Sequence, residues 1–427
     1  MSTIEFFKLI SEDAPVYLVC LAFMLISYRL FFKWKVTSIY DPLYFYIIFT
    51  NAICSANMAF LAYSKRIDNY FLTNYILSEL ALLLGIFIFL KKPGILASST
   101  PRSDCRFQFK LKQGMRLAIA VIVLVNLVIY ATRGIPLFMD SRSESSNGGS
   151  GFGFFTRVSQ NATMLLLLFY YSKSHLTKGK TSFMEKSYVI ASGVLGLLSG
   201  YKAFFLNYLF VYFLFNKNTI SGKVTAKMAM VVAGGTTIMI LLFSIIMGTY
   251  NINIILLGFC TRIVASGDVY YMGYVDNSLK HLPPPHFFYQ MFGSTLASFR
   301  LLEWNEVPRN MGIALNEVVN KYESLDGPTF RYNMLWIYLT GSTFLTTVLS
   351  LGTGAIIGFM HRLVNQKQVI NLRYIVVCFF YLKSFLLILG PDMAINDISL
   401  SIIIILPFFI ILHVILPFGN SKSAALK

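Results

Sequence analysis

Residues 70–90, YFLTNYILSELALLLGIFIFL, decide the fold of this chain. The stretch contains a single charged side chain, Glu79. A helix that crosses the hydrocarbon core of a bilayer, about 30 Å thick, needs about 20 mostly apolar residues at about 1.5 Å each. The stretch therefore predicts a transmembrane helix.

Similar stretches recur along the whole chain, and its composition agrees with them. Of 427 residues, 56% are hydrophobic and 13% are charged, about half the charged fraction of soluble domains. These figures exclude a soluble enzyme, a disordered chain and a small disulfide scaffold. We therefore expect one integral membrane domain over residues 1–427, an all-α polytopic transmembrane helix bundle of about eleven spans, within a range of about ten to twelve. The predicted spans lie near residues 15–32, 42–63, 70–90, 116–131, 156–172, 228–248, 334–360, 371–389 and 393–417, and 188–215 is expected to form two short helices that meet at 200–202.

The distribution of charge predicts the orientation of these helices. Lys and Arg number 36 against 19 Asp and Glu, which gives a net charge of +17. Segment 91–116, directly after residues 70–90, holds seven basic residues and one acid. Such a segment is typical of a cytoplasmic loop, because membrane proteins retain Lys and Arg on that side. With this count of spans the N-terminus lies outside and the C-terminus is cytoplasmic.

Two long segments then lie on the outer side of the membrane. Residues 132–156 form a first loop rich in Ser and Gly, and residues 249–333 form a larger loop that we expect to fold over the mouth of the bundle. The larger loop begins with the apolar stretch 252–260. A twelfth span there would move the loop to the basic side, so we favour a helix that lies in the membrane interface.

Several catalytic and metal-binding signatures are absent from the sequence. It contains no phosphate-binding loop, no GxGxxG after a strand, no HExxH and no GxSxG, which removes the sequence support for ATP-driven transport and zinc hydrolysis. The five cysteines are far apart and form no CxxC, so we predict no metal and no cofactor. His281 and His286 flank three prolines that hold them apart. This favours loop histidines over a metal pair and leaves His281 as a possible base.

Basic residues on the outer side are the unusual feature, because the positive-inside bias removes them from there. A guanidinium group binds two phosphate or carboxylate oxygens at once. The pattern therefore suggests an anionic ligand at the membrane surface, and pairing with acids of the same loops is the alternative. The candidates are Arg142 in the first loop, Arg262, Arg300, Arg309 and Arg331 in the second, and Lys202 at the turn between the two short helices.

Glu79 and Lys383 are the candidates for functional charged residues inside the predicted spans, where burial in hydrocarbon is costly. We expect them either to pair with each other as a structural clamp or to belong to a proton relay. Three glycines of a later span, Gly352, Gly354 and Gly358, are expected to let helix backbones approach closely.

Several motifs resemble those of bacterial O-antigen polymerases of the Wzy type, which are oligosaccharide repeat unit polymerases. The first outer loop, with Arg133-Gly134-Ile135-Pro136-Leu137, Arg142 and the Gly-rich segment 148–153, is similar to the first long periplasmic loop of that family. Arg142 and Arg262 each precede a glycine in the RX10G pattern found in two loops of some members. Further similarities are the 199–202 turn, Asp41-Pro42-Leu43, and Gly327 to Arg331 before a Gly-rich span.

The resemblance implies a membrane glycosyltransferase with an architecture like that of the GT-C class, in the bacterial inner membrane. Such an enzyme transfers a growing glycan from undecaprenyl pyrophosphate onto the non-reducing end of a new lipid-linked unit, on the periplasmic face. A chain-length regulator and a flippase are the implied partners, and no nucleic acid is expected. The alternatives are a flippase or other transporter of the same lipid-linked oligosaccharides and an O-antigen ligase.

The same resemblance assigns roles to residues of the outer segments. Arg142, Arg262, Arg331 and Lys202, with Arg300 and Arg309 as second-rank candidates, would hold the pyrophosphates of donor and acceptor. A general base for the acceptor hydroxyl must lie within hydrogen-bond reach of it. Asp268, Glu303, Glu306 and His281 are the available groups, and the sequence does not separate them.

Overall fold

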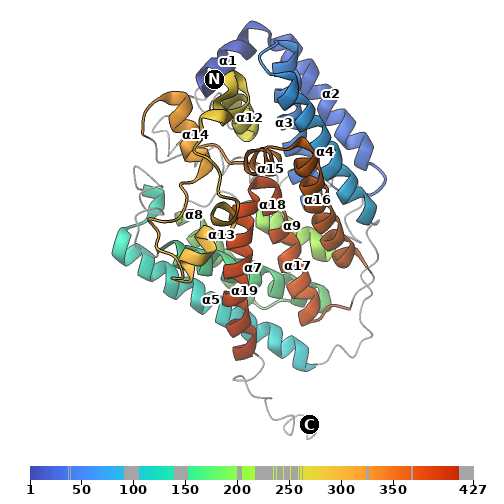
Figure 1. Cartoon of the computed structure of the whole chain (residues 1–427). Helices are drawn as coiled ribbons and strands as arrows, with labels where there is room; N and C mark the ends of the chain where they lie inside the picture. The colour runs from blue at the N-terminus through green and yellow to red at the C-terminus, as the bar shows by residue number, and fades with distance from the viewer. Residues whose placement is uncertain are drawn as a thin grey trace, which may run out of the picture. The chain divides into compact units, whose positions relative to one another are not determined.

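The computed structural model describes residues 1–90 except 37 and 39, then 105–138, 152–199, 204–216, 263–323, 327–366 and 369–412, with a few isolated residues between 217 and 262. These residues form 16 α-helices (Figure 1), and no β-strand occurs among them. The chain is an all-α, multi-pass membrane protein by helix length and hydropathy. The all-α polytopic fold predicted from the sequence is confirmed.

Seven helical segments of the described chain are long and apolar enough to span a bilayer. They are Ala14–Phe32 (α2), Tyr44–Tyr63, Asn69–Phe89 (α4), Phe107–Arg133, Thr343–Asn365 (α16), Leu372–Leu389 and Pro391–Ile410 (α19). Seven is fewer than the predicted eleven, for reasons that differ between segments. The expected span 156–172 lies in helix α7 (Phe152–Leu176), whose hydropathy is lowered by Arg157, Gln160 and Asn161. The expected pair of short helices in 188–215 is present as α8 (Phe183–Leu198) and α9 (Phe204–Asn216), and most of 228–248 lies outside the described residues.

The chain divides into two compact units, the first made of Met1–Gly94, Ile220–Gln366 and Tyr381–Asn396. In this unit α4 and α16 pack side by side along their length (Figure 1). A Cβ added to Gly354 would lie 2.1 Å from the Leu82 carbonyl oxygen, and one added to Gly358 would lie 2.5 Å from that of Ile86. The two helices therefore touch through their backbones, as expected for Gly354 and Gly358, whereas Gly352 faces open space.

The predicted span 334–360 is wrong in one respect, because the chain reverses direction inside it. Helix α15 (Tyr332–Thr340) ends at Gly341, which has a left-handed φ of 61°, and α16 starts at Thr343. Residues 82 and 354, and 86 and 358, are neighbours, so α4 and α16 run in the same direction. The Tyr70 hydroxyl, at the start of α4, donates to the Gly341 carbonyl oxygen at 3.2 Å. Helix α15 therefore ends at the level of the start of α4, and α16 then runs beside α4 in the same direction.

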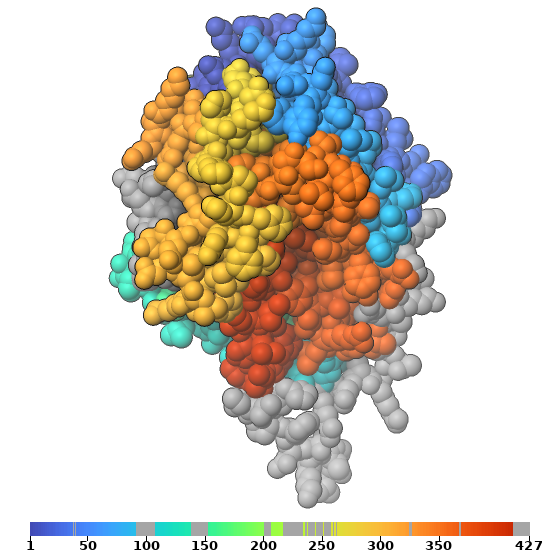
Figure 2. Space-filling view, viewed as in Figure 1, coloured from blue at the N-terminus to red at the C-terminus, as the bar shows by residue number. Residues whose placement is uncertain are grey.

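The described part of the large loop belongs to the same unit, and its first helix packs on the N-terminal helices. It forms α12 (Asp268–Gly273), the 3-10 segment η4 (Val275–His281), α13 (Phe287–Ser298) and α14 (Met311–Asn320). The N-terminal helix α1 (Thr3–Glu12) begins with a capping box between Ser2 and Glu5. Its Phe6 ring stacks on Tyr271 of α12 at 4.2 Å between centroids, and Figure 2 shows this yellow segment beside the blue N-terminal helices. The N-terminus and α12 therefore lie at the same end of the unit.

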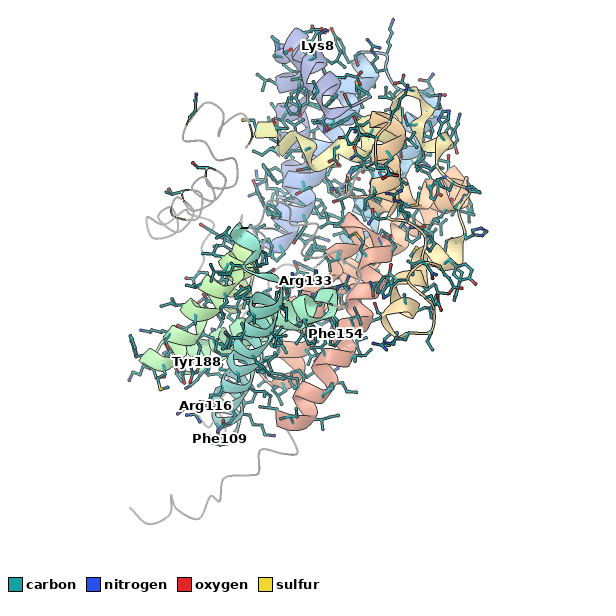
Figure 3. The ribbon with its side chains drawn as sticks, turned by 90° about the vertical axis from the view of Figure 1, so that its left-hand side faces the viewer. Lys8, Phe109, Arg116, Arg133, Phe154 and Tyr188 are labelled. Carbon is teal, nitrogen blue, oxygen red and sulfur yellow. The ribbon has the colours of Figure 1, made fainter. Side chains whose placement is uncertain are left out.

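The second unit comprises Ile95–Thr219, Lys367–Phe380 and Asp397–Lys427. Its long helix α5 (Cys105–Arg133) packs on α7, where Gly114 leaves room for the Phe169 ring. Figure 3 shows α5 passing from Phe109 and Arg116 at one end to Arg133 at the other. Helix α8 begins with a capping box formed by Ser182 and Glu185, and the Glu185 carboxylate also accepts a hydrogen bond from Lys173 of α7.

Candidate functional site: a buried polar cluster at the start of α15

The Glu79 carboxylate is the centre of a buried polar cluster in the first unit. Its Oε1 accepts hydrogen bonds from the Tyr28 hydroxyl at 2.6 Å and the Asn51 amide at 2.9 Å. Its Oε2 accepts one from the Tyr332 hydroxyl at 2.5 Å. Glu79 is 6% exposed, so these three donors replace the water that an ionised carboxylate needs.

Asn51 connects this carboxylate to a buried arginine. Its side-chain amide donates to Glu79, and its Oδ1 accepts from an Nη atom of Arg331. Asn51 is the last residue of the π-helix η1 (Tyr44–Asn51), which leads into α3 (Ala52–Tyr63). π-Helical turns are rare and occur often at functional sites. The amide thus bridges one acidic and one basic side chain.

The depth of Arg331 in the helix bundle follows from the direction in which α15 runs relative to α4. Glu79 is the eleventh of the 21 residues of α4, so it lies near the middle of a candidate span. Tyr332, the first residue of α15, bonds to Glu79, and Gly341, just after its end, bonds to Tyr70. The axial distance from residue 332 to 341 along α15 is about 13.5 Å at 1.5 Å per residue. The distance from residue 70 to 79 along α4 is the same, because both segments advance by nine residues. The N-terminus of α15 therefore lies at about half the depth of α4, as in a re-entrant helix.

The start of α15 carries polar hydrogens that lack an acceptor among the described residues. Arg331 is 2% exposed and Asn333 is fully buried. The Arg331 Nε and the Asn333 Nδ2 have no hydrogen-bond partner there. Arg331 is also the N-cap of α15, and no side chain caps this helix end. Buried donors without acceptors are uncommon, and a helix N-terminus attracts negative charge. The chemistry available at this point is the binding of an anion.

Aromatic side chains from α4 and α12 cover the cluster on one side. The Tyr270 hydroxyl donates to Asn333 Oδ1 at 2.8 Å, and its ring meets the Tyr75 ring edge-on at 5.0 Å. Phe71 and Tyr274 stack at 4.6 Å one turn away. Burial raises the pKa of Tyr270 well above its usual value, so its hydroxyl stays protonated and acts as a donor.

A second buried polar group involves Asp41, the residue that opens the Asp41-Pro42-Leu43 motif. Asp41 Oδ2 lies 3.6 Å from His361 Nε2 of α16, and Asp41 Oδ1 accepts from the Tyr381 hydroxyl at 3.3 Å. The Leu43 N–H also donates to Asp41 Oδ1, at 3.0 Å. This group joins the start of η1 to α16 and α17 (Leu372–Ser384), which is a structural role for the motif.

The residues predicted to bind pyrophosphate occupy different surroundings. Arg331 is buried in the cluster, whereas Arg300 is exposed in a left-handed conformation with φ of 57°. Arg309 is 56% exposed and pairs with Glu317 at 2.5 Å. This pair agrees with the alternative prediction, in which a loop arginine pairs with an acid of the same loop. Arg142, Arg262 and Lys202 lie outside the described residues.

The four predicted base residues are also separated by the fold. Asp268 begins α12, the helix that supplies Tyr270 to the cluster. Glu303 and Glu306 are exposed and share a turn, in which Glu306 accepts from the Glu303 N–H at 3.0 Å. His281 is exposed at the end of η4. Asp268 is therefore the predicted base on the element that contacts the cluster.

The expected pair of Glu79 with Lys383 is wrong, because the described partners of Glu79 are Tyr28, Asn51 and Tyr332. These three residues were not predicted from the sequence. A signal existed in Asn51, since a polar amide is uncommon in an otherwise apolar span. Among the described residues no group of three His, Cys, Asp or Glu side chains is arranged to hold a metal ion.

Comparisons with known proteins found no match: no protein-family model, no curated protein and no solved structure matches the chain. The similarity to O-antigen polymerases therefore stays a prediction from short motifs.

Proposed function

We propose that this protein is a membrane glycosyltransferase of the O-antigen polymerase type. In this proposal it transfers a glycan from a polyprenyl pyrophosphate carrier, undecaprenyl pyrophosphate in bacteria, onto the non-reducing end of a second lipid-linked unit. The observation that carries the proposal is the buried Arg331 at the N-terminus of α15, at half the depth of a membrane span and with its Nε unpaired among the described residues. An anionic group attached to a lipid can reach that depth, whereas a water-soluble anion would have to leave the aqueous phase to do so.

The cluster supplies what departure of a lipid pyrophosphate requires. The acceptor hydroxyl oxygen attacks the anomeric carbon of the donor sugar, and the bond from that carbon to the pyrophosphate oxygen breaks. Negative charge then grows on the pyrophosphate, where Arg331 Nε, Asn333 Nδ2 and the α15 N-terminus stabilise it electrostatically. The acceptor proton passes to a general base, for which Asp268 on α12 ranks first.

The first test is complementation of a strain that lacks the gene, with glycan chain length as the readout. The wild-type gene should restore a ladder of long chains, and Arg331→Gln should leave single repeats. Loss of one preorganised donor lowers such rates by about 10²–10³. Arg331→Lys keeps the charge and should restore part of the ladder. The control is Lys8→Gln, which removes an exposed positive charge on α1 and should give the wild-type ladder.

Two results would contradict this proposal. The first is a full ladder from Arg331→Gln at the wild-type protein level in the membrane. The second is a deletion strain whose lipid core carries no repeat unit at all, because that pattern belongs to a missing flippase or ligase.

A flippase for the same lipid-linked units is the second candidate. The observation that favours it is the N-terminus of α15 with Arg331 at mid-depth, because the substrate sites of transporters are often formed by the ends of broken helices near the bilayer midplane. Purified protein in sealed vesicles separates the two functions. A flippase moves a labelled lipid-linked oligosaccharide between leaflets without lengthening it, and a polymerase lengthens it.

A further inference from the structure

Helix α13 has an exposed aromatic face that no other described helix of the first unit covers. Its residues 287–298 include no Asp, Glu, Lys or Arg. Phe287 is 46% exposed, Phe288 58% and Tyr289 46%, and Phe288 packs on Phe292 one turn later at 5.3 Å. With 12 residues, α13 is too short to span a bilayer.

The segment that follows α13 also exposes large apolar side chains. Phe299 is 40% exposed, Leu301 73% and Trp304 60%. These fractions are similar to those of Leu18 (61%) and Phe23 (63%), which lie on the candidate span α2. The charged residues of this segment, Arg300, Glu303 and Glu306, all come after the helix.

Contacts of the other face of α13 with the candidate span α19 fix the depth of α13. The Gln290 side chain lies close to the Asp392 carboxyl group, and Ser298 Oγ lies 3.5 Å from Asn396 Oδ1. Both partners belong to the first turns of α19, which begins at Pro391. Asn396 lies five residues into that helix, about 7.5 Å from its start at 1.5 Å per residue. The C-terminal end of α13 is therefore level with a position inside the span.

We infer that α13 and the loop to Trp304 lie in the membrane interface, with Phe287, Phe288 and Trp304 among the phospholipid acyl chains next to the headgroups. Aromatic side chains concentrate at this level of a bilayer, and interfacial helices bury their apolar face about 5–10 Å deep. The partner of this surface is the phospholipid leaflet itself. The inference does not depend on the proposed glycosyltransferase activity.

Trp304 gives a direct test, because the chain has three tryptophans and the other two can be replaced. The W34F/W336F variant is reconstituted in phosphatidylcholine–phosphatidylglycerol vesicles, with and without phosphatidylcholine brominated at acyl carbons near the headgroup. Brominated lipid should lower the Trp304 emission by about half or more, because a tryptophan in the interface lies next to the brominated carbons. Aqueous acrylamide should quench it much less than it quenches free N-acetyltryptophanamide. The matched control is W34F/W304F, which keeps Trp336, 7% exposed, and should respond weakly to both quenchers.

Two outcomes would overturn the inference. Quenching of Trp304 by acrylamide as strong as for the free compound, with no effect of brominated lipid, would place the loop in water. Protection from both quenchers would place it against protein. A second measurement uses the wild-type chain. A phospholipid with a photoreactive group near the ester bond should label the peptide 287–304, and absence of label there beside labelled α2 would also count against the inference.

Discussion

At the scale of single residues, Glu79 and Arg331 share the side-chain amide of Asn51. One buried carboxylate and one buried guanidinium are not in direct contact, yet each bonds to the same side chain. A buried charge is tolerated when hydrogen bonds replace its hydration. Glu79 has three such bonds, which explains how a carboxylate remains in the middle of an apolar helix.

Glu79→Gln should destabilise the first unit. A glutamine amide brings two N–H groups to a site where three donors already point at Glu79, so at least one donor loses its acceptor. We expect the free energy of unfolding to fall by about 2–3 kcal/mol, measured by thermal denaturation in detergent followed by circular dichroism. Glu323→Gln, at an exposed position, is the matched control and should be neutral. Equal stability of the two variants would show that Glu79 is not held by these bonds.

At the scale of helices, the contact between α4 and α16 positions the cluster. Gly354 and Gly358 let the two backbones touch, and Glu79 then meets the residues at the start of α15. The sequence pattern predicts these glycines as packing positions. The break at Gly341 was not predicted, because residues 334–360 contain no charged side chain and hydropathy does not record a change of direction.

Alanine substitutions at Gly354, which touches α4, and at Gly352, which faces open space, should change the stability in opposite directions. Gly354→Ala would place a methyl group 2.1 Å from the Leu82 carbonyl oxygen, so the helices must separate, at a cost of about 1–3 kcal/mol. Gly352→Ala meets nothing within 4 Å and should raise stability by up to about 1 kcal/mol through helix propensity. Thermal unfolding in the same detergent compares them. A Gly354→Ala protein as stable as Gly352→Ala would contradict the close packing of α4 and α16.

At the scale of the whole molecule, composition and hydropathy were sufficient for the all-α membrane fold. They were not sufficient for the site. The sequence directed attention to the arginines of the outer loops as a set, and one of the described members, Arg331, is buried at mid-depth while Arg309 pairs with Glu317 on the surface. The burial of Arg331 depends on the direction of α15, which hydropathy does not record.

The measurement that most directly tests the role of Arg331 is the binding of undecaprenyl pyrophosphate to the purified protein in detergent, followed by thermophoresis. Charge-assisted hydrogen bonds contribute about 1.5–3 kcal/mol, so Arg331→Gln should weaken binding by about 10–100-fold. Lys8→Gln should bind as the wild type does, and undecaprenol without phosphate should bind the wild type and Arg331→Gln equally. Equal affinity of wild type and folded Arg331→Gln for the pyrophosphate would contradict an anion site at the start of α15.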